Sequence, residues 1–260
     1  MVNFLLSQRQ QTLAPVEPGQ QHRKAPNHRF GSYHHFLQTF KDQGYQFCKF
    51  PELTEPKRQI ALRHDIDFDT NFALQSALIE TEMGIQSTYF FLLRSNFYNI
   101  FSPQDYENIS LIREMGHTIS VHFDPSIYED FHEGLKKEVM LFREFFREEV
   151  GIISLHRPNA FFQEFDAPIF GIEHTYQSKY FRDVKYISDS TGVWRFGHPF
   201  DTPEFAQQKS IHLLIHPIWW MLEGSTNLDK LKVYYAQRVN SLKSDFSNNC
   251  IPFRKINESL

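Results

Sequence analysis

Acidic and imidazole side chains recur where apolar segments of the chain end. The sequence RHDID at 63–67 closes one such segment. Side chains alternate along a strand, so Asp65 and Asp67 share one face with Arg63. Two carboxylates about 7 Å apart can bind a metal ion and act as a base. Taken alone, these residues are equally well interpreted as a salt-bridged strand end that caps the following helix.

Polar residues also close the segments that follow. They are His122, the pair His156-Arg157 before Pro158, Asp189 in the sequence SDS, and His216 before Pro217. A single histidine at a strand end is more often structural than catalytic, and we expect His117, on the strand face opposite His122, to be structural. Five successive segment ends bearing Asp, His, Arg, Asp and His favour an active site.

Alternating strands and helices would have to position these residues. The patterns predict strands over 60–67, 86–93, 118–123, 152–157, 186–190 and 211–216, and helices over 70–83, 103–116, 129–150 and 228–243. Such alternation predicts βα units with a parallel sheet or barrel. Parallel α/β folds place their chemistry at the carboxyl ends of the strands, where the polar residues occur.

The composition is that of a folded domain. The chain has 260 residues, 41% of them hydrophobic, which suffices for a sizeable core and excludes disorder over most of its length. The formal charge of -4 argues against a nucleic-acid-binding surface. Cys48 and Cys250 give neither a disulfide framework nor a Cys-rich zinc site. We expect an irregular, Gln- and Pro-rich arm over 1–28 and a single domain over 29–260.

Membrane insertion and secretion are not predicted. No apolar stretch approaches the roughly 18 residues that span a bilayer. The apolar residues near the N-terminus, at 4–6, are fewer than the about 7–15 of a secretory signal. We therefore expect a cytoplasmic protein without a membrane span, and the oligomeric state does not follow from the sequence.

The order of these motifs resembles that of the polysaccharide deacetylase superfamily (NodB homology domain, carbohydrate esterase family 4). The matching segments are RHDID at 63–67, STYFF at 87–91, GHTISVH at 116–122, Arg157-Pro158, the looser pair Asp189 and Trp194, and LIH at 214–216. The resemblance covers about 58–220. It implies a distorted, (β/α)7-type barrel that uses a divalent metal, commonly zinc, to remove acetyl groups from N-acetylated sugars.

The chain departs from the usual family pattern at one ligand position. Typical members have a second histidine four residues after the first, where this chain has Ser126. It is similar to a branch with RHDxD, HRP, SDS and IHP motifs that is associated with surface-polysaccharide gene clusters. There His156 can replace the missing ligand, so Asp67, His122 and His156 would hold Zn²⁺, with Asp124 as a competing third ligand.

The resemblance also implies roles for the remaining residues. Asp65 would be the general base, oriented by Arg157. His216 would be the general acid, with Asp189 as its electrostatic partner. The substrate candidates are Leu214 and Trp194, which would line an acetyl pocket or simply pack in the core, and Arg195, Trp219 and Trp220, which would contact sugar rings. The predicted function is a metal-dependent deacetylase of a carbohydrate; the alternative is a non-catalytic carbohydrate-binding pseudoenzyme on the same barrel.

Overall fold

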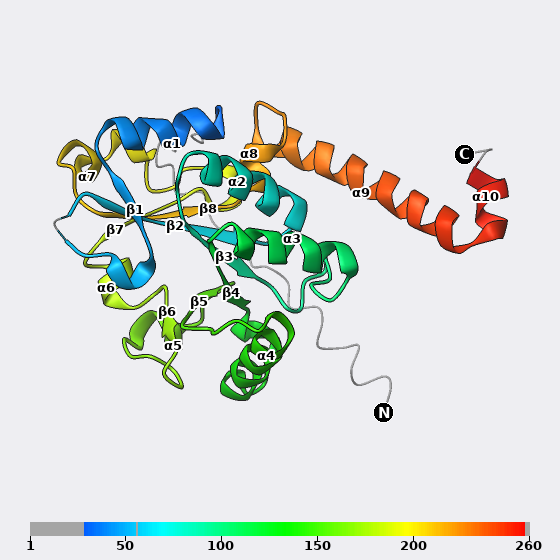
Figure 1. Cartoon of the computed structure of the whole chain (residues 1–260), viewed down its shortest axis with the longest axis horizontal. Helices are drawn as coiled ribbons and strands as arrows, with labels where there is room; N and C mark the ends of the chain where they lie inside the picture. The colour runs from blue at the N-terminus through cyan, green and yellow to red at the C-terminus, as the bar shows by residue number, and fades with distance from the viewer. Residues whose placement is uncertain (1–28, 56, 258–260) are drawn as a thin grey trace, which may run out of the picture.

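The computed structural model describes residues 29–55 and 57–257 (Figure 1), so the predicted arm over 1–28 lies outside the described residues. The strands are β1 (Gln46–Cys48), β2 (Gln59–Ile66), β3 (Thr88–Phe91), β4 (Thr118–Phe123), β5 (Ile152–Leu155), β6 (Glu173–His174), β7 (Lys185–Ser188) and β8 (Ile211–Ile215). The helices are α1 (Tyr33–Asp42), α2 (Thr70–Glu82), α3 (Pro103–Glu114), α4 (Phe131–Phe146), α5 (Ala160–Glu164), α6 (Ser178–Phe181), α7 (Pro203–Ala206), α8 (Ile218–Met221), α9 (Asn227–Asn249) and α10 (Ile251–Asn257).

These strands form one parallel sheet in the order β6-β5-β4-β3-β2-β8-β7, and β1 pairs with β2 beside this path. The sheet is curled, and β6 and β7 both lie toward the left in Figure 1. The guanidinium of Arg63, in the central strand β2, lies 6.0 Å from the ring of Tyr176, which follows β6. The predicted α/β fold with a distorted barrel is confirmed.

The main elements match the predicted ones, with shifted ends. The helix predicted over 129–150 ends at Phe146, because Arg147 adopts a left-handed conformation (φ 54°) that stops it before Gly151. The helix predicted over 228–243 continues to Asn249. The patterns missed β1 and β6, of three and two residues, which are too short to show an alternation. No helix within residues 29–55 and 57–257 has the length and apolarity needed to cross a membrane.

A buried carboxylate ties α2 to the outer side of the sheet. Glu80 accepts hydrogen bonds from the hydroxyls of Tyr33 (2.5 Å), Ser87 (2.6 Å) and Tyr89 (2.9 Å), and its Oε1 lies 2.7 Å from Nε2 of His64. Burial alone would raise the pKa of Glu80, but the facing histidine and the hydroxyl donors hold it below its usual value. The contacts of these four groups with one buried carboxylate link α1, α2, β2 and β3.

Glu80→Gln is expected to lower the free energy of unfolding by about 3 kcal/mol at pH 7, because the amide nitrogen would meet donors that need an acceptor. The pKa of Glu80 is depressed in the folded chain, so its carboxylate stabilises the fold above the unfolded pKa of about 4.3 and loses this effect as pH falls through the folded pKa. Urea unfolding of the wild type and of Glu80→Gln should therefore show a difference in the free energy of unfolding that becomes smaller below about pH 4. The exposed Glu82→Gln is the matched control, and a pH-independent difference would contradict the expectation.

Candidate metal centre and active site

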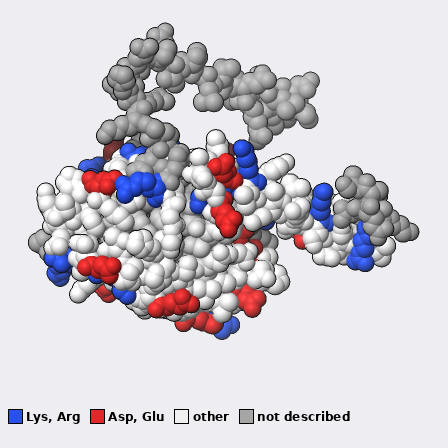
Figure 2. Space-filling model, turned by 90° about the horizontal axis from the view of Figure 1, so that it is seen from above, with Lys and Arg blue, Asp and Glu red and all other residues white. Residues whose placement is uncertain are grey.

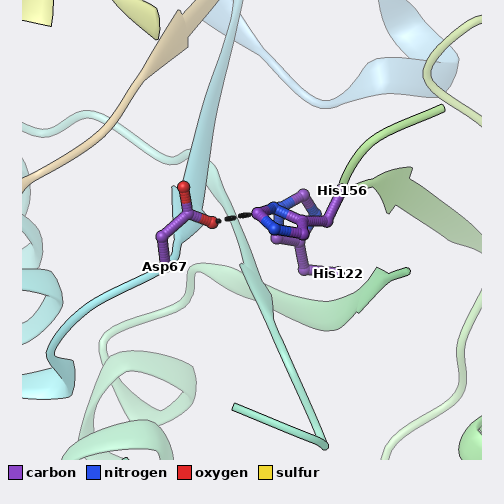
Figure 3. A group of neighbouring side chains, drawn as sticks. All are labelled: Asp67, His122 and His156. Carbon is purple, nitrogen blue, oxygen red and sulfur yellow. Dashed lines mark ion pairs between the residues drawn. The ribbon is translucent and has the colours of Figure 1, made fainter. Parts of the chain in front are cut away.

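Three segments far apart in sequence bring metal-ligating side chains together. Asp67 directly follows β2, His122 lies in β4, and His156 directly follows β5. Oδ1 of Asp67 lies 3.2 Å from Nε2 of His122 and 3.5 Å from Nδ1 of His156. One ligand atom from each residue lies within 4.8 Å of the others. Figure 3 shows both imidazoles directed toward the carboxylate, so the structure brings together the three residues predicted as ligands.

The neighbouring strand fixes the orientation of His122. Its Nδ1 lies 2.6 Å from the hydroxyl of Ser154, its partner in the β4–β5 register. With Nδ1 engaged by the hydroxyl, Nε2 is the atom left to face Asp67. Metal-binding histidines are commonly held in this way through their second ring nitrogen. Ser154 was not predicted as part of the site, because an isolated serine inside a buried strand carries no signal of its own.

A backbone turn at the end of β5 brings His156 to the same place. The strand stops at Leu155, the His156 amide donates to the carbonyl of Phe123 (2.8 Å), and Arg157 adopts a left-handed conformation with φ 55°. The prediction of His156 as a ligand required a break in the strand alternation at this point, and the turn provides it. The rings of His122 and His156 meet edge to face with centroids 5.1 Å apart.

The residues fit a divalent metal. Oδ1 of Asp67 is buried and has no hydrogen-bond partner, although two imidazole nitrogens face it. Burial would raise the pKa of Asp67, but His122, His156 and His216 hold it far below its usual value, so the carboxylate is charged. One carboxylate and two imidazoles form a donor set of the kind that catalytic zinc uses, with a fourth position left for water or substrate.

Arg63 holds the second carboxylate of the motif. Its Nε and Nη2 donate to the two oxygens of Asp65 at 2.8 and 2.7 Å, and both side chains are buried. Burial would raise the pKa of Asp65, but the guanidinium of Arg63 outweighs it and lowers the pKa to about 2. Oδ2 of Asp65 lies 3.7 Å from Nε2 of His122, which places an ionised carboxylate beside the candidate ligands.

The structure pairs Arg157 with Asp124 and not with Asp65, whose carboxylate accepts from Arg63 instead. The left-handed turn carries the Arg157 side chain outward, where 68% of it is exposed and its Nη1 lies 3.6 Å from Oδ2 of Asp124. The strand alternation already placed Arg63 on the face of Asp65, so the signal for this pair was present in the sequence.

His216 is held on the other side of Asp67. Its Nε2 lies 3.7 Å from Oδ2 of Asp67, and its Nδ1 lies 2.7 Å from Oδ1 of Asp189. Asp189 also accepts hydrogen bonds from the His216 amide (3.0 Å) and from Nε1 of Trp220 (2.9 Å). Burial alone would lower the pKa of His216, but Asp189 raises it to about 9. The predicted pairing of His216 with Asp189 is present, and Trp220 contacts Asp189.

A cavity of about 10 Å³ touches Asp65, Asp67 and His216. This is about the space that one water molecule occupies. The lining of this cavity also includes Ile66, Phe72 and Ile218, and neither His122 nor His156 is part of it.

The remaining predicted residues lie at varying distances from this centre. Asp124 accepts hydrogen bonds from the amide and hydroxyl of Ser126 and is not among the three clustered ligands. Leu214 is buried two residues before His216, on the same strand face. Its contact with an acyl group remains a prediction.

The tryptophans of the prediction pack into the core. Trp194 is 3% exposed and stacks with Phe30 and Phe36 in the apolar cluster that also contains Trp219 and Trp220. This burial favours core packing over contact with a sugar ring. Arg195 is exposed, and its Nη2 donates to Thr191 Oγ1 at 3.1 Å.

No protein-family model and no curated protein matches the chain. Among solved structures, a deacetylase of Streptococcus pyogenes in complex with acetate is 13% identical, with 78% of this chain and 88% of that chain covered and a TM-score of 0.42. A family 4 carbohydrate esterase from Bacillus anthracis is 14% identical, with 84% and 94% covered and a TM-score of 0.38. A chitin deacetylase from Colletotrichum lindemuthianum is 14% identical, with 69% and 84% covered and a TM-score of 0.36.

Proposed function

We propose that this protein is a metal-dependent hydrolase that removes an acetyl or related acyl group from the nitrogen of a sugar or glycan intermediate. The observation that carries the proposal is the convergence of two sets of groups on Asp67. Its Oδ1 faces the imidazoles of His122 and His156, and its Oδ2 faces His216. Oδ2 of the base candidate Asp65 lies 3.7 Å from Nε2 of His122. The motif order that resembles the polysaccharide deacetylases supports an N-acylated carbohydrate as the substrate.

The chemistry divides among the side chains of the site. A divalent metal held by Asp67, His122 and His156 would act as a Lewis acid on the acyl carbonyl. Asp65, ionised beside Arg63, takes a proton from the attacking water. The water oxygen joins the acyl carbon, the carbon–nitrogen bond breaks, and His216 donates a proton to the departing amine. The products are a free amine on the sugar and a carboxylic acid.

The test is a metal analysis of the purified protein together with an assay of acetate release from N-acetylated sugars. We expect about one divalent ion per chain and acetate release that a chelator abolishes and added metal restores. Binding of the sugars without acetate release, in protein that contains metal, would favour the carbohydrate-binding alternative. The missing second histidine at Ser126 is the observation on which that alternative depends.

His216→Gln is expected to reduce the rate of amide hydrolysis by about 10²-fold or more, because the departing amine would lack a proton donor. An ester whose leaving group needs no proton, such as 4-nitrophenyl acetate, should be hydrolysed at a rate much closer to that of the wild type. The measurement is the ratio of the two rates in each protein, with metal content as the control. An equal loss on both substrates would remove His216 from the acid role.

A further inference from the structure

Helix α9 leaves the body of the protein after its first turns. Near its N-terminus, Lys230 donates to the carbonyls of Trp219 (2.5 Å) and Leu222 (2.7 Å), and the Tyr234 hydroxyl donates to the carbonyl of Phe68 (2.8 Å). From Tyr235 to Asn249 no side chain is buried. Figure 1 shows this outer part extending away from the barrel, with α10 at its far end. A helix stretch of this kind lacks the tertiary packing that normally stabilises helices in proteins.

The outer part of α9 carries an exposed apolar face. Tyr235, Val239, Leu242 and Phe246, here called the α9 stripe, follow one another at intervals of four, three and four residues. At 100° per residue they lie within about 60° of one another around the helix. Tyr235, Leu242 and Phe246 are 72, 57 and 51% exposed, and the ring centroid of Phe253 in α10 lies 5.3 Å from that of Phe246. Figure 2 shows uncharged surface along this arm that is interrupted by Lys or Arg side chains.

The spacing of the stripe is the same in both directions along the helix. In an antiparallel pair with its two-fold axis between Asn240 and Ser241, Tyr235 lies opposite Phe246 of a second copy, and Val239 lies opposite Leu242. All four side chains of each copy then enter one seam. A surface that is complementary to itself under a two-fold rotation is the requirement for a closed homodimer.

The charges beside the stripe agree with the same pairing. Arg238 and Asp245 lie on one side of the stripe, and in an antiparallel pair the same sides of the two helices face each other. Arg238 therefore approaches Asp245 of the second copy, and symmetry produces this ion pair twice. On the other side, Lys232 and Lys243 lie nearest to the uncharged Ser247 and Ala236 of the second copy, and the two Lys243 residues are offset by about 7.5 Å along the helix axis.

We propose that this chain forms a two-fold dimer in which two copies of α9 pack antiparallel through the α9 stripe. Because the helix extends away from the barrel, the two barrels lie at opposite ends of the pair. This inference does not depend on the proposed activity, because it concerns a surface that lies outside the active site.

The first test is sedimentation velocity of the full chain over a wide range of micromolar concentrations. The wild type is expected to shift from the mass of one chain to that of two, and Leu242→Asp, in the middle of the seam, is expected to remain a single chain. Gln237→Asp adds the same charge on the opposite side of α9 and should dimerise like the wild type. Far-UV circular dichroism checks that each variant retains its helices. A wild type that stays monomeric, or two variants that dimerise equally, would overturn the proposal.

A charge exchange identifies the pairing itself. Arg238→Asp and Asp245→Arg should each weaken dimerisation by about tenfold, because each places like charges together twice. The double variant restores opposite charges and should recover the affinity of the wild type. Additive weakening in the double variant would exclude the antiparallel register, and with it the proposed dimer.

Discussion

Asp65→Asn is expected to lower turnover by about 10²–10⁴-fold while the metal content stays unchanged. Asparagine keeps the size of the side chain and can still accept a hydrogen bond from Arg63, but it cannot take a proton from water. The carboxylate is ionised in the folded chain, since Arg63 lowers its pKa to about 2 against the effect of burial. The measurement is the rate of acetate release together with metal analysis of the same preparation.

Asp69→Asn is the matched control for this variant. The control variant makes the same chemical change four residues further on. There Asp69 caps α2 by accepting a hydrogen bond from the Asn71 amide at 2.9 Å. Asparagine caps helices about as well as aspartate, so fold and turnover should both be retained. Loss of metal together with turnover in Asp65→Asn would make Asp65 a ligand and would contradict the division of roles between Asp65 and Asp67.

Much of the site followed from the two-residue period of strands. The alternation places Asp65 and Asp67 on the inner face and His64 on the outer one, and the structure has this arrangement, with His64 against Glu80. The predicted opposition of His117 and His122 is also present, because His117 lies with Ser87 and Glu80 outside the barrel. These features depend only on the face of a strand, which local sequence determines.

The arginine that holds the carboxylate of Asp65 could not be predicted in the same way. The choice between Arg63 and Arg157 depends on a single left-handed residue after β5, and positive φ is uncommon in arginine. No local pattern predicts such a turn. The contact of Trp220 with Asp189 likewise requires the chain to fold back through α8 after β8, which is a tertiary event. Sequence therefore predicted which residues reach the strand ends, and the backbone turns there decided which of them meet.

His156→Ala is expected to weaken metal binding by at least about 100-fold, as much as or more than His122→Ala does. Loss of a residue that only orients a ligand already costs about 10–100-fold in affinity, and loss of the ligand itself should cost no less. The Nδ1 of His156 lies 3.5 Å from Oδ1 of Asp67, the same oxygen that Nε2 of His122 faces. Metal content after equilibration with a competing chelator measures the effect.

Two further variants separate a ligand from a nearby residue. Asp124→Ala should keep most of the metal, because the carboxylate of Asp124 is engaged by Ser126 and Arg157 and is not part of the three-residue cluster. His132→Ala removes a partly exposed histidine of α4 and should bind metal like the wild type. Full occupancy in His156→Ala would leave the third position to Asp124 or to water. Such a result would also favour carbohydrate binding without catalysis.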